Sequence, residues 1–443
     1  MRAGHVFHRS THGWSPIAVR GEGIFLIDAD GRRYVDACGG AAVSCLGHGH
    51  PAVIAALAEQ AARLEYVHTG FFTSKAAEEL AEMIAKQSPG ALDRVWYTSS
   101  GSEATEAALK LARQYHLERG DAGRNNLIAR RLSYHGNTLG ALAAGGSAWR
   151  RKPYEPLLID VALTDPCFEY RCAAPGEISE DYGRGAADAL EAEIQRLGPE
   201  TVMAFIAETV VGATTGAVPP VQGYLRRIRE ICDRHGVLLI LDEVMCGSGR
   251  TGTFLSCEQD GVVPDIVTLG KGLGAGYQPV GAVVCTRGVY ETIAGGSGAL
   301  MHGQTYNAHP VGCAAALAVQ RVIRDERLLE RVREAGSRLM GLLKARFGNH
   351  PYVGDIRGRG LLLGIELVAD RETKAPFDPE VALHQRAKSE AFARGLLIYP
   401  GGGTVDGRSG DHILLAPPYN VTDDELEMIV DLLAQTLEAV LPS

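Results

Sequence analysis

The sequence has no excess of positive charge and no long apolar run, and both absences exclude classes of function. Its 44 lysines and arginines against 53 aspartates and glutamates give a net charge of −9, so we expect neither a nucleic-acid-binding surface nor attachment to anionic lipids. No stretch approaches the roughly 18 apolar residues that a membrane-spanning helix needs. With 46% hydrophobic and 22% charged residues among 443, we expect a globular protein of two or three domains, or one large domain with a satellite.

Paired cysteine motifs and an apolar leader are also missing. The nine cysteines include no C-x-x-C pair, and Cys167 and Cys172 have no histidine beside them to complete a zinc site. We therefore expect reduced thiols and no bound metal. Residues 1–5 contain no apolar segment of the kind that a signal peptide needs. Together these features predict a cytoplasmic protein.

Residues 237–271 place an acid and an amine at the ends of two predicted strands. The apolar run 237–241 is followed by Asp242, and the run 265–269 is followed shortly by Lys271. Ligands bind beyond the carboxyl ends of strands in open α/β sheets, so we expect both side chains in one pocket. An aldehyde cofactor with a basic ring nitrogen needs this pair: the amine forms an imine with the aldehyde, and the carboxylate keeps the ring nitrogen protonated. Taken singly, each residue is equally compatible with a turn cap or a solvated surface.

Alternating helix and strand signals from about residue 75 to 320 predict an α/β fold with a mostly parallel sheet covered on both faces. We expect three parts. Residues 1–60 form an N-terminal segment that contributes to a small domain and to the site entrance, residues 61–324 form the large domain, and residues 325–443 form a C-terminal small domain. The irregular stretch 165–185 is expected to be a surface excursion.

A second feature is a predicted helix N-terminus that is able to bind phosphate. Ser100 and Glu103 fit a capping box, so a helix is expected to begin there. Gly101 and Ser102 would then present backbone amides and a hydroxyl where the helix dipole favours an anion. Capped helices without a ligand are commoner than phosphate sites, so this signal depends on its neighbours. The polar, glycine-punctuated loop 302–306 is a further candidate for phosphate contact.

Two more strand ends direct side chains toward the same edge of the sheet. Tyr134 and His135 follow the apolar run 126–129, where an aromatic ring is able to stack on a flat ligand. The apolar run 204–207 ends in Glu208, which we expect to point into the same crevice. Each signal alone is compatible with core packing. Together they predict one pocket that contains donors, a carboxylate, an amine and a ring.

Six motifs, in this order, resemble those of the class III (ω-type) aminotransferases, which are pyridoxal-phosphate (PLP) enzymes of fold type I. The motifs lie at residues 100–104, 134–136, 242–244, 249–252, 270–272 and 303–306. The resemblance covers nearly the whole chain. It implies a large domain with a seven-stranded, mostly parallel sheet, and a smaller α+β domain built from the two termini. It also implies a homodimer, or a tetramer, with shared active sites.

The resemblance assigns roles around the cofactor ring. It implies that Lys271 bonds covalently to the aldehyde and then carries the proton between substrate and cofactor. Asp242 pairs with the pyridinium nitrogen, Val244 packs behind the ring, and Tyr134 stacks in front of it. These four residues would therefore hold the ring and supply the acid–base chemistry.

The remaining predicted cofactor contacts lie around the phosphate and the strand ends. By the same resemblance, the amides of Gly101 and Ser102 hold the phosphate. Thr305 reaches the phosphate bound in the neighbouring subunit, which requires the homodimer. His135 and Glu208 complete the predicted cofactor-binding set. No metal is expected in this site.

Three departures from the α-ketoglutarate-using branch of the family carry the information about substrate. No arginine precedes the Ala-Pro-Pro that begins at Ala416, Ala213 stands about where that branch has a gating glutamate, and Met245 replaces a glutamine that bonds the cofactor's phenolic oxygen. All three changes resemble the amine:pyruvate branch. We therefore expect transfer of an amino group from an ω-amino acid or amine to a keto acid, pyruvate, by a ping-pong mechanism.

Two side chains are expected to shape the substrate pocket. The amine:pyruvate branch binds carboxylates through a mobile arginine just before a Gly-Asp-His motif, and Arg408 stands about one residue from that position. Its glycine-rich loop 401–410 makes alternative conformations accessible, although a solvated loop arginine explains the sequence equally well. Where the branch often has a tryptophan, this chain has Ala42, which implies a roomier pocket.

Two other readings stay open. The first is a PLP racemase, aminomutase or decarboxylase on the same fold, since substrate orientation decides between these reactions. Accumulation of pyridoxamine phosphate with an amine alone would separate a transaminase from a racemase. The second is a non-catalytic PLP-binding regulator, which would need an attached DNA-binding module; we expect the roughly 50 acidic-to-neutral N-terminal residues to be too few for one.

Overall fold

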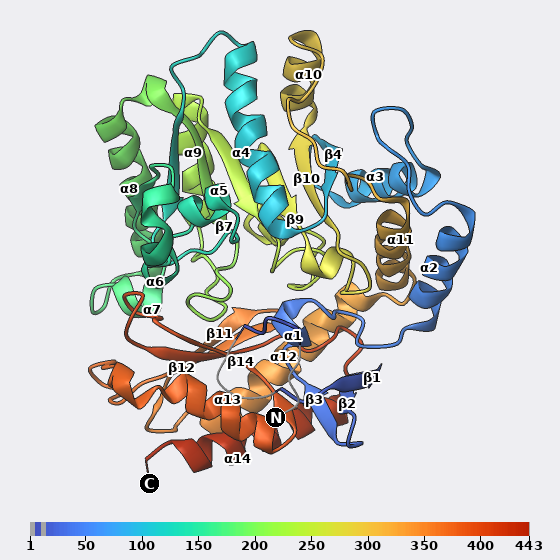
Figure 1. The fold of residues 1–443 in the computed structure, drawn as a ribbon. Coiled ribbons are helices and arrows are strands. Elements are labelled where there is room, and N and C mark those ends of the chain that lie inside the picture. The colour runs from blue at the N-terminus through green and yellow to red at the C-terminus, as the bar shows by residue number, and fades with distance from the viewer. Residues whose placement is uncertain (1–4, 10–14, 443) are drawn as a thin grey trace.

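The structure, a computed structural model, describes residues 5–9 and 15–442 and has a larger and a smaller part (Figure 1). The larger part is built on a seven-stranded sheet in the order β4-β10-β9-β8-β7-β5-β6. β10 is antiparallel to both of its neighbours, and the other pairings are parallel. The strands are β4 Leu92–Thr98, β5 Asn126–Arg130, β6 Ala162–Thr164, β7 Val202–Glu208, β8 Leu238–Asp242, β9 Ile266–Leu269 and β10 Gly281–Thr286. The predicted mostly parallel sheet is therefore confirmed.

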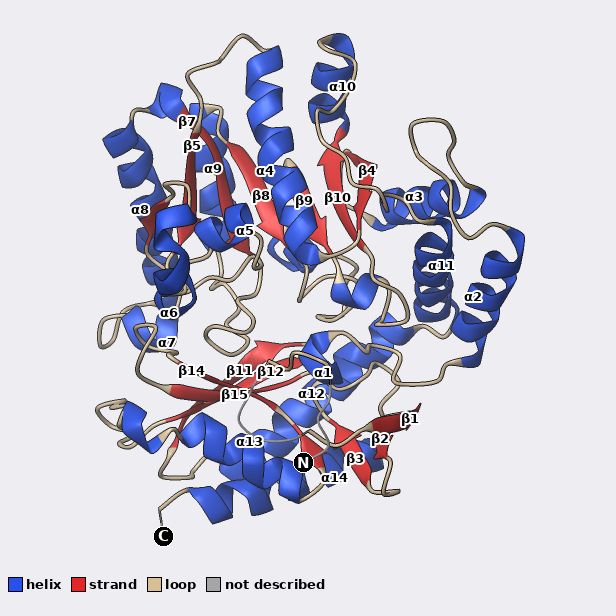
Figure 2. Ribbon diagram, viewed as in Figure 1, coloured by secondary structure: helices blue, strands red, loops and turns tan. Residues whose placement is uncertain are grey.

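Helices cover both faces of this sheet (Figure 2). One face packs against α4 and α10, and the other against α3, α8, α9 and α11. Short helices α5, α6 and α7 lie in the connections between β5 and α8. The helices are α3 Lys75–Gln87, α4 Gly101–Glu118, α5 Leu139–Ala144, α6 Ala148–Arg151, α7 Glu169–Cys172, α8 Ser179–Leu197, α9 Tyr224–His235, α10 Arg287–Gly295 and α11 Pro310–Asp325.

The position of the central strand β8 explains why residues 238–241 form a continuous apolar run. Leu238 and Ile240 belong to the apolar cluster beneath α4, whereas Leu239 and Leu241 belong to the cluster on the opposite face. Because helices cover both faces, every position along the strand is buried. The strand ends at Asp242, which is its first polar residue. Burial of the run therefore delivers the carboxylate to the edge where ligands bind in such sheets.

The smaller part contains two four-stranded sheets, in the orders β1-β2-β3-β13 and β11-β12-β15-β14. β13 pairs in parallel with β3, so segments from the two ends of the chain share one sheet. The strands are β1 Ala18–Glu22, β2 Phe25–Asp28, β3 Arg33–Asp36, β11 Val353–Arg359, β12 Leu362–Leu367, β13 Leu396–Leu397, β14 Tyr399–Gly402 and β15 Asp411–Leu415. This arrangement confirms the predicted small domain of mixed α and β structure from both termini.

Helices α12 Leu328–Phe347, α13 Leu383–Ala393 and α14 Asp423–Val440 cover the small sheets, and their apolar residues share one cluster with the sheets. Helix α11 contributes to that cluster and to the core of the large sheet, so it joins the two parts. Two further helices are α1 Gly39–Ala42 and α2 Pro51–Arg63. Single 3₁₀ turns are η1 Lys152–Leu157, η2 Pro199–Thr201, η3 Ser256–Asp260, η4 Lys271–Leu273 and η5 Pro379–Val381.

The predicted domain limits stay a prediction. The limit at 324/325 falls at the end of α11, and the N-terminal segment 1–60 includes residues 1–4 and 10–14, which lie outside the described residues. The prediction that 165–185 is a surface excursion is wrong in part. Phe168 in this stretch is buried against Val211 and Val218, because the segment folds back onto the loop that follows β7.

Within the described residues no helix is long and apolar enough to cross a bilayer. Over the same residues, no group of three or more histidine, cysteine, aspartate or glutamate side chains is arranged to hold a metal ion. All nine cysteines are free thiols, and all except Cys172 are buried.

A buried histidine in β15 predicts a loss of stability in mild acid. Burial, with the positive charge of Arg357 nearby, lowers the pKa of His412 to about 3, and Thr404 Oγ1 lies 2.7 Å from its Nδ1. A histidine in the unfolded chain titrates near 6.5, so protons favour the unfolded state below that pH. This contribution to stability is complete above pH 6.5 and is lost as the pH falls toward 3, by about 2 kcal/mol between pH 7 and pH 5.

The measurement is the free energy of unfolding in urea at pH 7 and at pH 5, for the wild type and for His412→Gln. The variant is expected to be less stable at pH 7, because the ring packs in a closed site, but its stability should fall less between the two pH values. Equal falls in the two proteins would show that His412 does not titrate in this way.

Candidate active site

A cavity of about 160 Å³ opens at the carboxyl ends of β8, β7 and β5. It collects the predicted acid, amine, ring and helix N-terminus, which come from segments far apart in the chain. Its lining residues are Ser100, Gly101, Ser102, Tyr134, His135, Gly136, Glu208, Val210, Ala213, Asp242, Val244, Met245 and Lys271. The parallel strand order explains the gathering, since successive strands end at the same edge of the sheet.

Asp242 is held at the base of this cavity by two donors. Its Oδ1 accepts from the backbone N–H of Val244 at 2.9 Å, and its Oδ2 lies 2.7 Å from Nδ1 of His135. Both side chains are buried. The Nε2 of His135 is also buried and has no hydrogen-bond partner within the described residues. The histidine therefore orients the carboxylate, a relation that the sequence analysis did not predict.

Lys271 has the strained backbone that is common at functional sites. Its φ of +42° lies in the left-handed region, which a residue with a side chain adopts at a cost of about 1–3 kcal/mol. Burial lowers the pKa of the Lys271 amine, whereas the negative charges of Asp242 and Glu208 act against that shift. A lysine with a lowered pKa carries more of the neutral amine that is needed for attack on a carbonyl.

Glu208 holds two loops beside the cavity. Its carboxylate accepts from the backbone N–H of Tyr134 at 3.0 Å and of Gly212 at 3.0 Å. Arg130, itself buried, donates to the Glu208 carbonyl. Burial raises the pKa of Glu208, and the neighbouring Asp242 adds to that shift. The residue lies where predicted, and its contacts are those of a group that positions the tyrosine.

The opposite end of the cavity has the form of an anion cradle. Ser100 Oγ accepts from the N–H of Glu103 at 3.2 Å and caps α4, and the N–H of Asn137 donates to Ser102 Oγ at 3.2 Å. The Glu103 carboxylate accepts from the N–H of Ser99 at 2.7 Å, one residue earlier than a capping box requires. Ser100, Gly101 and Ser102 all line the cavity at the N-terminus of α4, where the helix dipole favours an anion.

Two glycines allow the segments around this cradle to approach one another closely. A Cβ on Gly101 would lie 2.6 Å from Cγ1 of Val244, and one on Gly136, which has a φ of +135°, would lie 2.4 Å from Oγ of Ser102. Both separations are closer than real Cβ atoms approach other groups. Together with the buried acid and the amine, the residues present fit a planar aldehyde cofactor that carries a phosphate.

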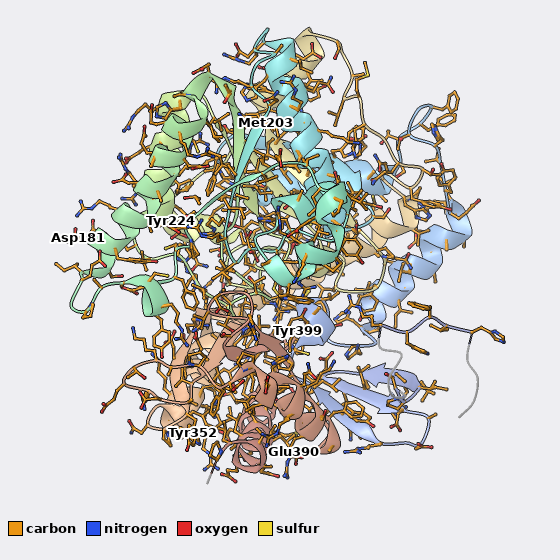
Figure 3. The ribbon with its side chains drawn as sticks, turned by 60° about the vertical axis from the view of Figure 1, so that its left-hand side comes forward. Asp181, Met203, Tyr224, Tyr352, Glu390 and Tyr399 are labelled. Carbon is orange, nitrogen blue, oxygen red and sulfur yellow. The ribbon has the colours of Figure 1, made fainter. Side chains whose placement is uncertain are left out.

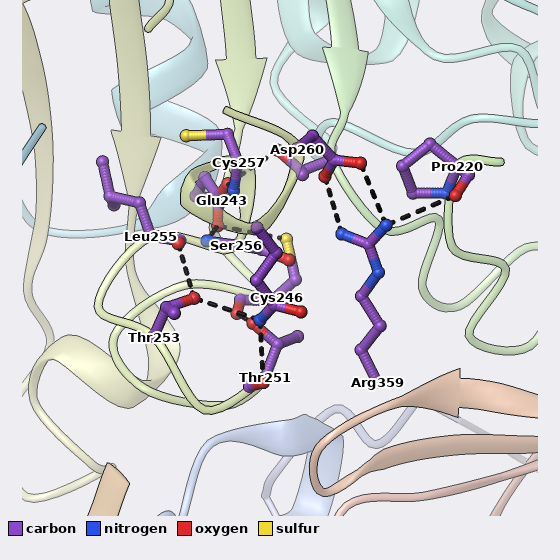
Figure 4. Close-up of polar contacts among 12 residues, drawn as sticks. Pro220, Glu243, Cys246, Thr251, Thr253, Leu255, Ser256, Cys257, Asp260 and Arg359 are labelled. Carbon is purple, nitrogen blue, oxygen red and sulfur yellow. Dashed lines mark hydrogen bonds and ion pairs between the residues drawn. The ribbon is translucent and has the colours of Figure 1, made fainter. Parts of the chain in front are cut away.

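A second network, next to Asp242, was missed from the sequence (Figure 4). The buried carboxylate of Glu243 accepts from the Thr209 hydroxyl at 2.7 Å, and from the N–H groups of Ser256 at 2.8 Å and Cys257 at 2.9 Å. It thereby closes the loop from 244 to 257 on itself. Because this loop carries Val244, the network fixes one wall of the cavity. The adjacent acids at 242 and 243 were the available signal.

A larger cavity of about 740 Å³ lies between the two parts of the molecule, and Figure 3 shows one of its lining residues, Tyr399, at that junction. Ala213 lines both cavities, so they meet at this residue. Arg408 lines the larger one, where it is exposed. The backbone N–H of Arg408 donates to Asp406 at 2.8 Å. The turn is thus ordered, and within the described residues the Arg408 side chain has no partner.

Two predicted site residues lie outside both cavity linings. Ala42 is buried in an apolar cluster that also contains Met245, so it backs the cofactor cavity and does not line it. Thr305 is exposed on the loop after α10, and its carbonyl accepts from the Tyr66 hydroxyl at 3.0 Å. Its predicted role concerns a neighbouring subunit, and in a single chain it does not approach the cavity.

Comparisons with known proteins agree with this geometry. The model of the family described as "Aminotransferase class-III" matches residues 7–437. An uncharacterized aminotransferase of Schizosaccharomyces pombe is 44% identical over 434 residues, which are 98% of this chain and 95% of that protein.

Solved structures agree as well. The (S)-enantioselective omega-transaminase of Thermomicrobium roseum has a TM-score of 0.90 at 37% identity, covering 97% of this chain and 93% of that one. The omega-transaminase of Pseudomonas jessenii in complex with PMP has a TM-score of 0.91 at 33% identity, over 96% of this chain and 93% of that one. The chain belongs to the class III aminotransferases, and it is a PLP-dependent transaminase of fold type I that takes an amine donor and a keto acid.

Proposed function

We propose that this transaminase moves an amino group from an ω-amino acid or an amine to pyruvate, by a ping-pong mechanism. The observation that carries this proposal is that Ala213, and not a residue with a carboxylate, lines both the cofactor cavity and the larger cavity where the two adjoin. The carboxylate of pyruvate or of an ω-amino acid therefore does not meet a fixed negative charge where the two cavities adjoin. The relatives from Thermomicrobium roseum and Pseudomonas jessenii are omega-transaminases, which supports the proposal.

The side chains that line the cofactor cavity have different roles in the reaction. When bound, the cofactor supplies an electron sink for the substrate carbon that loses its proton. Lys271 Nζ, with its lowered pKa, takes that proton and returns it to the adjacent atom. Asp242, held by His135, keeps a positive charge at the ring nitrogen. Tyr134, anchored through its N–H by Glu208, covers the outer face of the ring.

We infer that two copies of the chain form a homodimer and complete each other's sites. The segments around Thr305 expose large apolar side chains: Phe71 is 82% exposed, Phe72 68%, Met301 75% and Tyr306 60%. Such a group of exposed large apolar side chains favours burial against a partner. In that dimer Thr305 would contribute to the phosphate end of the partner's cavity, as the resemblance implies.

The decisive experiment is a set of half-reactions with the holoenzyme. An amine supplied alone should convert the cofactor to its aminated form, and pyruvate should convert it back, whereas α-ketoglutarate should do so poorly. Efficient return with α-ketoglutarate and not with pyruvate would overturn the acceptor assignment. Failure of every amine to convert the cofactor would favour the racemase, aminomutase or decarboxylase reading.

Arg408→Ala is expected to weaken the pyruvate half-reaction and to spare the half-reaction with an uncharged amine. A guanidinium that pairs with the acceptor's carboxylate contributes about 2–4 kcal/mol to kcat/KM, and an uncharged amine has no group to pair with it. Single-turnover kinetics of the two half-reactions, with Arg408→Lys as the matched variant, measure the difference. Equal losses for pyruvate and for an uncharged amine would mean that Arg408 supports the loop instead.

A further inference from the structure

Arg150, in the short helix α6, lines the larger cavity and forms no ion pair with any of the described residues. Its guanidinium carbon lies 4.9 Å from the ring centre of Tyr134 and 4.3 Å from that of Trp149. The Nε atom is buried with no hydrogen-bond partner, and within the described residues no acid forms an ion pair with this side chain. Two aromatic faces therefore hold the charge in place, and the Nε–H donor is left without an acceptor among the described residues.

The neighbouring basic residues are bound differently. Arg151 donates to the carbonyls of Ala143 and Gly145, which end α5, so its donors are occupied. Lys152 is exposed to solvent. Arg150 differs from both, because its side chain is half-buried and held by two aromatic rings, while its Nε has no hydrogen-bond partner within the described residues. The buried Nε–H of Arg150 has no acceptor within the described residues, which is costly unless a ligand supplies one.

The cavity around Arg150 is suited to an anion. Arg150 and Arg408 both line it. Its two acids do not neutralise Arg150: Asp406 accepts the backbone N–H groups of Arg408 and Ser409, and Glu155 is exposed. Since Tyr134 lines the cofactor cavity, Arg150 is separated from that cavity by a single ring. It is therefore placed to bind a group remote from the reacting amine.

We propose that Arg150 binds the carboxylate of ω-amino acid donors, while Arg408 binds the carboxylate of the keto acid acceptor. The planar fork of an arginine matches a carboxylate bidentately, and its fixed position selects donors whose acid lies several bonds from the amine. This inference rests on the proposed function and adds the donor class to it. Uncharged amines remain substrates, but without this contact.

The test compares two matched donors, 5-aminopentanoate and pentylamine, in single-turnover half-reactions of the holoenzyme. In Arg150→Gln, kcat/KM for 5-aminopentanoate should fall about 30-fold or more, and that for pentylamine should change less than about 3-fold. Arg150→Lys should recover part of the loss, since it keeps the charge but not the fork. Lys152→Ala removes an exposed charge from the same cavity and should leave the ratio of the two donors unchanged.

A second readout is independent of turnover. Pentanoate, which has neither an amino nor a keto group, should alter the emission of Trp149, which stacks on Arg150, and the uncharged pentanamide should not. Arg150→Gln should raise the Kd for pentanoate about tenfold or more. An unchanged Kd, or equal losses for 5-aminopentanoate and pentylamine, would overturn the inference and leave Arg150 as a support for Tyr134.

The two readouts also separate this inference from the proposed function. Failure of pyruvate to accept the amino group from the aminated cofactor in the wild type would contradict the acceptor assignment but would leave pentanoate binding to be measured. Normal pyruvate chemistry with no binding of pentanoate in the wild type would contradict the role of Arg150 alone. A loss for 5-aminopentanoate in Arg408→Ala and not in Arg150→Gln would place the donor carboxylate at Arg408.

Discussion

Lys271→Ala should retain the fold and bind PLP, yet lose turnover by about 10⁴-fold or more. The substitution removes both the covalent link and the base that moves the proton, and each effect alone is large. In the wild type, borohydride should fix the cofactor on Lys271, which peptide mapping after reduction would identify. The cavity is otherwise intact in the variant, because the phosphate cradle and Asp242 come from other segments.

The fold of the variant is checked by cooperative unfolding and by retention of the cofactor on dialysis. Alanine has the same backbone preference as lysine, so the substitution does not relieve the strain of the positive φ at position 271. A small stability change is therefore expected. A label on another lysine, or substantial turnover in the variant, would remove Lys271 from the site.

Asp242→Asn should have the second largest effect. The substitution keeps the shape but removes the charge that pairs with the ring nitrogen, and breaking such a buried pair costs about 3–5 kcal/mol. In this structure it also disturbs one of the two contacts of the carboxylate, with His135 or with the N–H of Val244, because the amide has a single acceptor oxygen. We expect a loss of this size in the chemical step, a smaller loss of cofactor affinity, and an altered visible spectrum.

Glu243→Gln is the matched control for Asp242→Asn. Glu243 is the adjacent buried acid, but its partners are Thr209, Ser256 and Cys257, and it does not line the cofactor cavity. The variant should be less stable and should show a smaller change in the visible spectrum than Asp242→Asn. Activity of Asp242→Asn within a few-fold of the wild type would show that its charge is not used in the reaction.

Local patterns in the sequence were sufficient to predict much of the cofactor cavity. Each strand end is marked by an apolar run that stops at a polar residue, and the run is apolar because helices bury both faces of the sheet. Asp242 and Glu208 were placed by this rule, and the Ser100 cap placed the start of α4. The roles assigned to these residues stay predictions until the variants are measured.

Contacts between distant segments could not be predicted in this way. His135 and Asp242 are 107 positions apart, and their contact depends on the order β8-β7-β5 in the sheet. A sequence pattern specifies which residues are buried, but not which strands are neighbours. The same limit applies to Glu243, whose partners come from a loop that folds back on itself.

By itself, the sequence determined the class of fold, the family motifs and the pair formed by Asp242 and Lys271. These features depend on local periodicity, helix capping and residue order, which are present before any packing occurs. Only the tertiary structure decided that Ala213 joins two cavities, that Ala42 lies behind one of them, and that Arg150 stacks on Tyr134. Such relations require the positions of side chains from several segments at once, and these positions are set by packing.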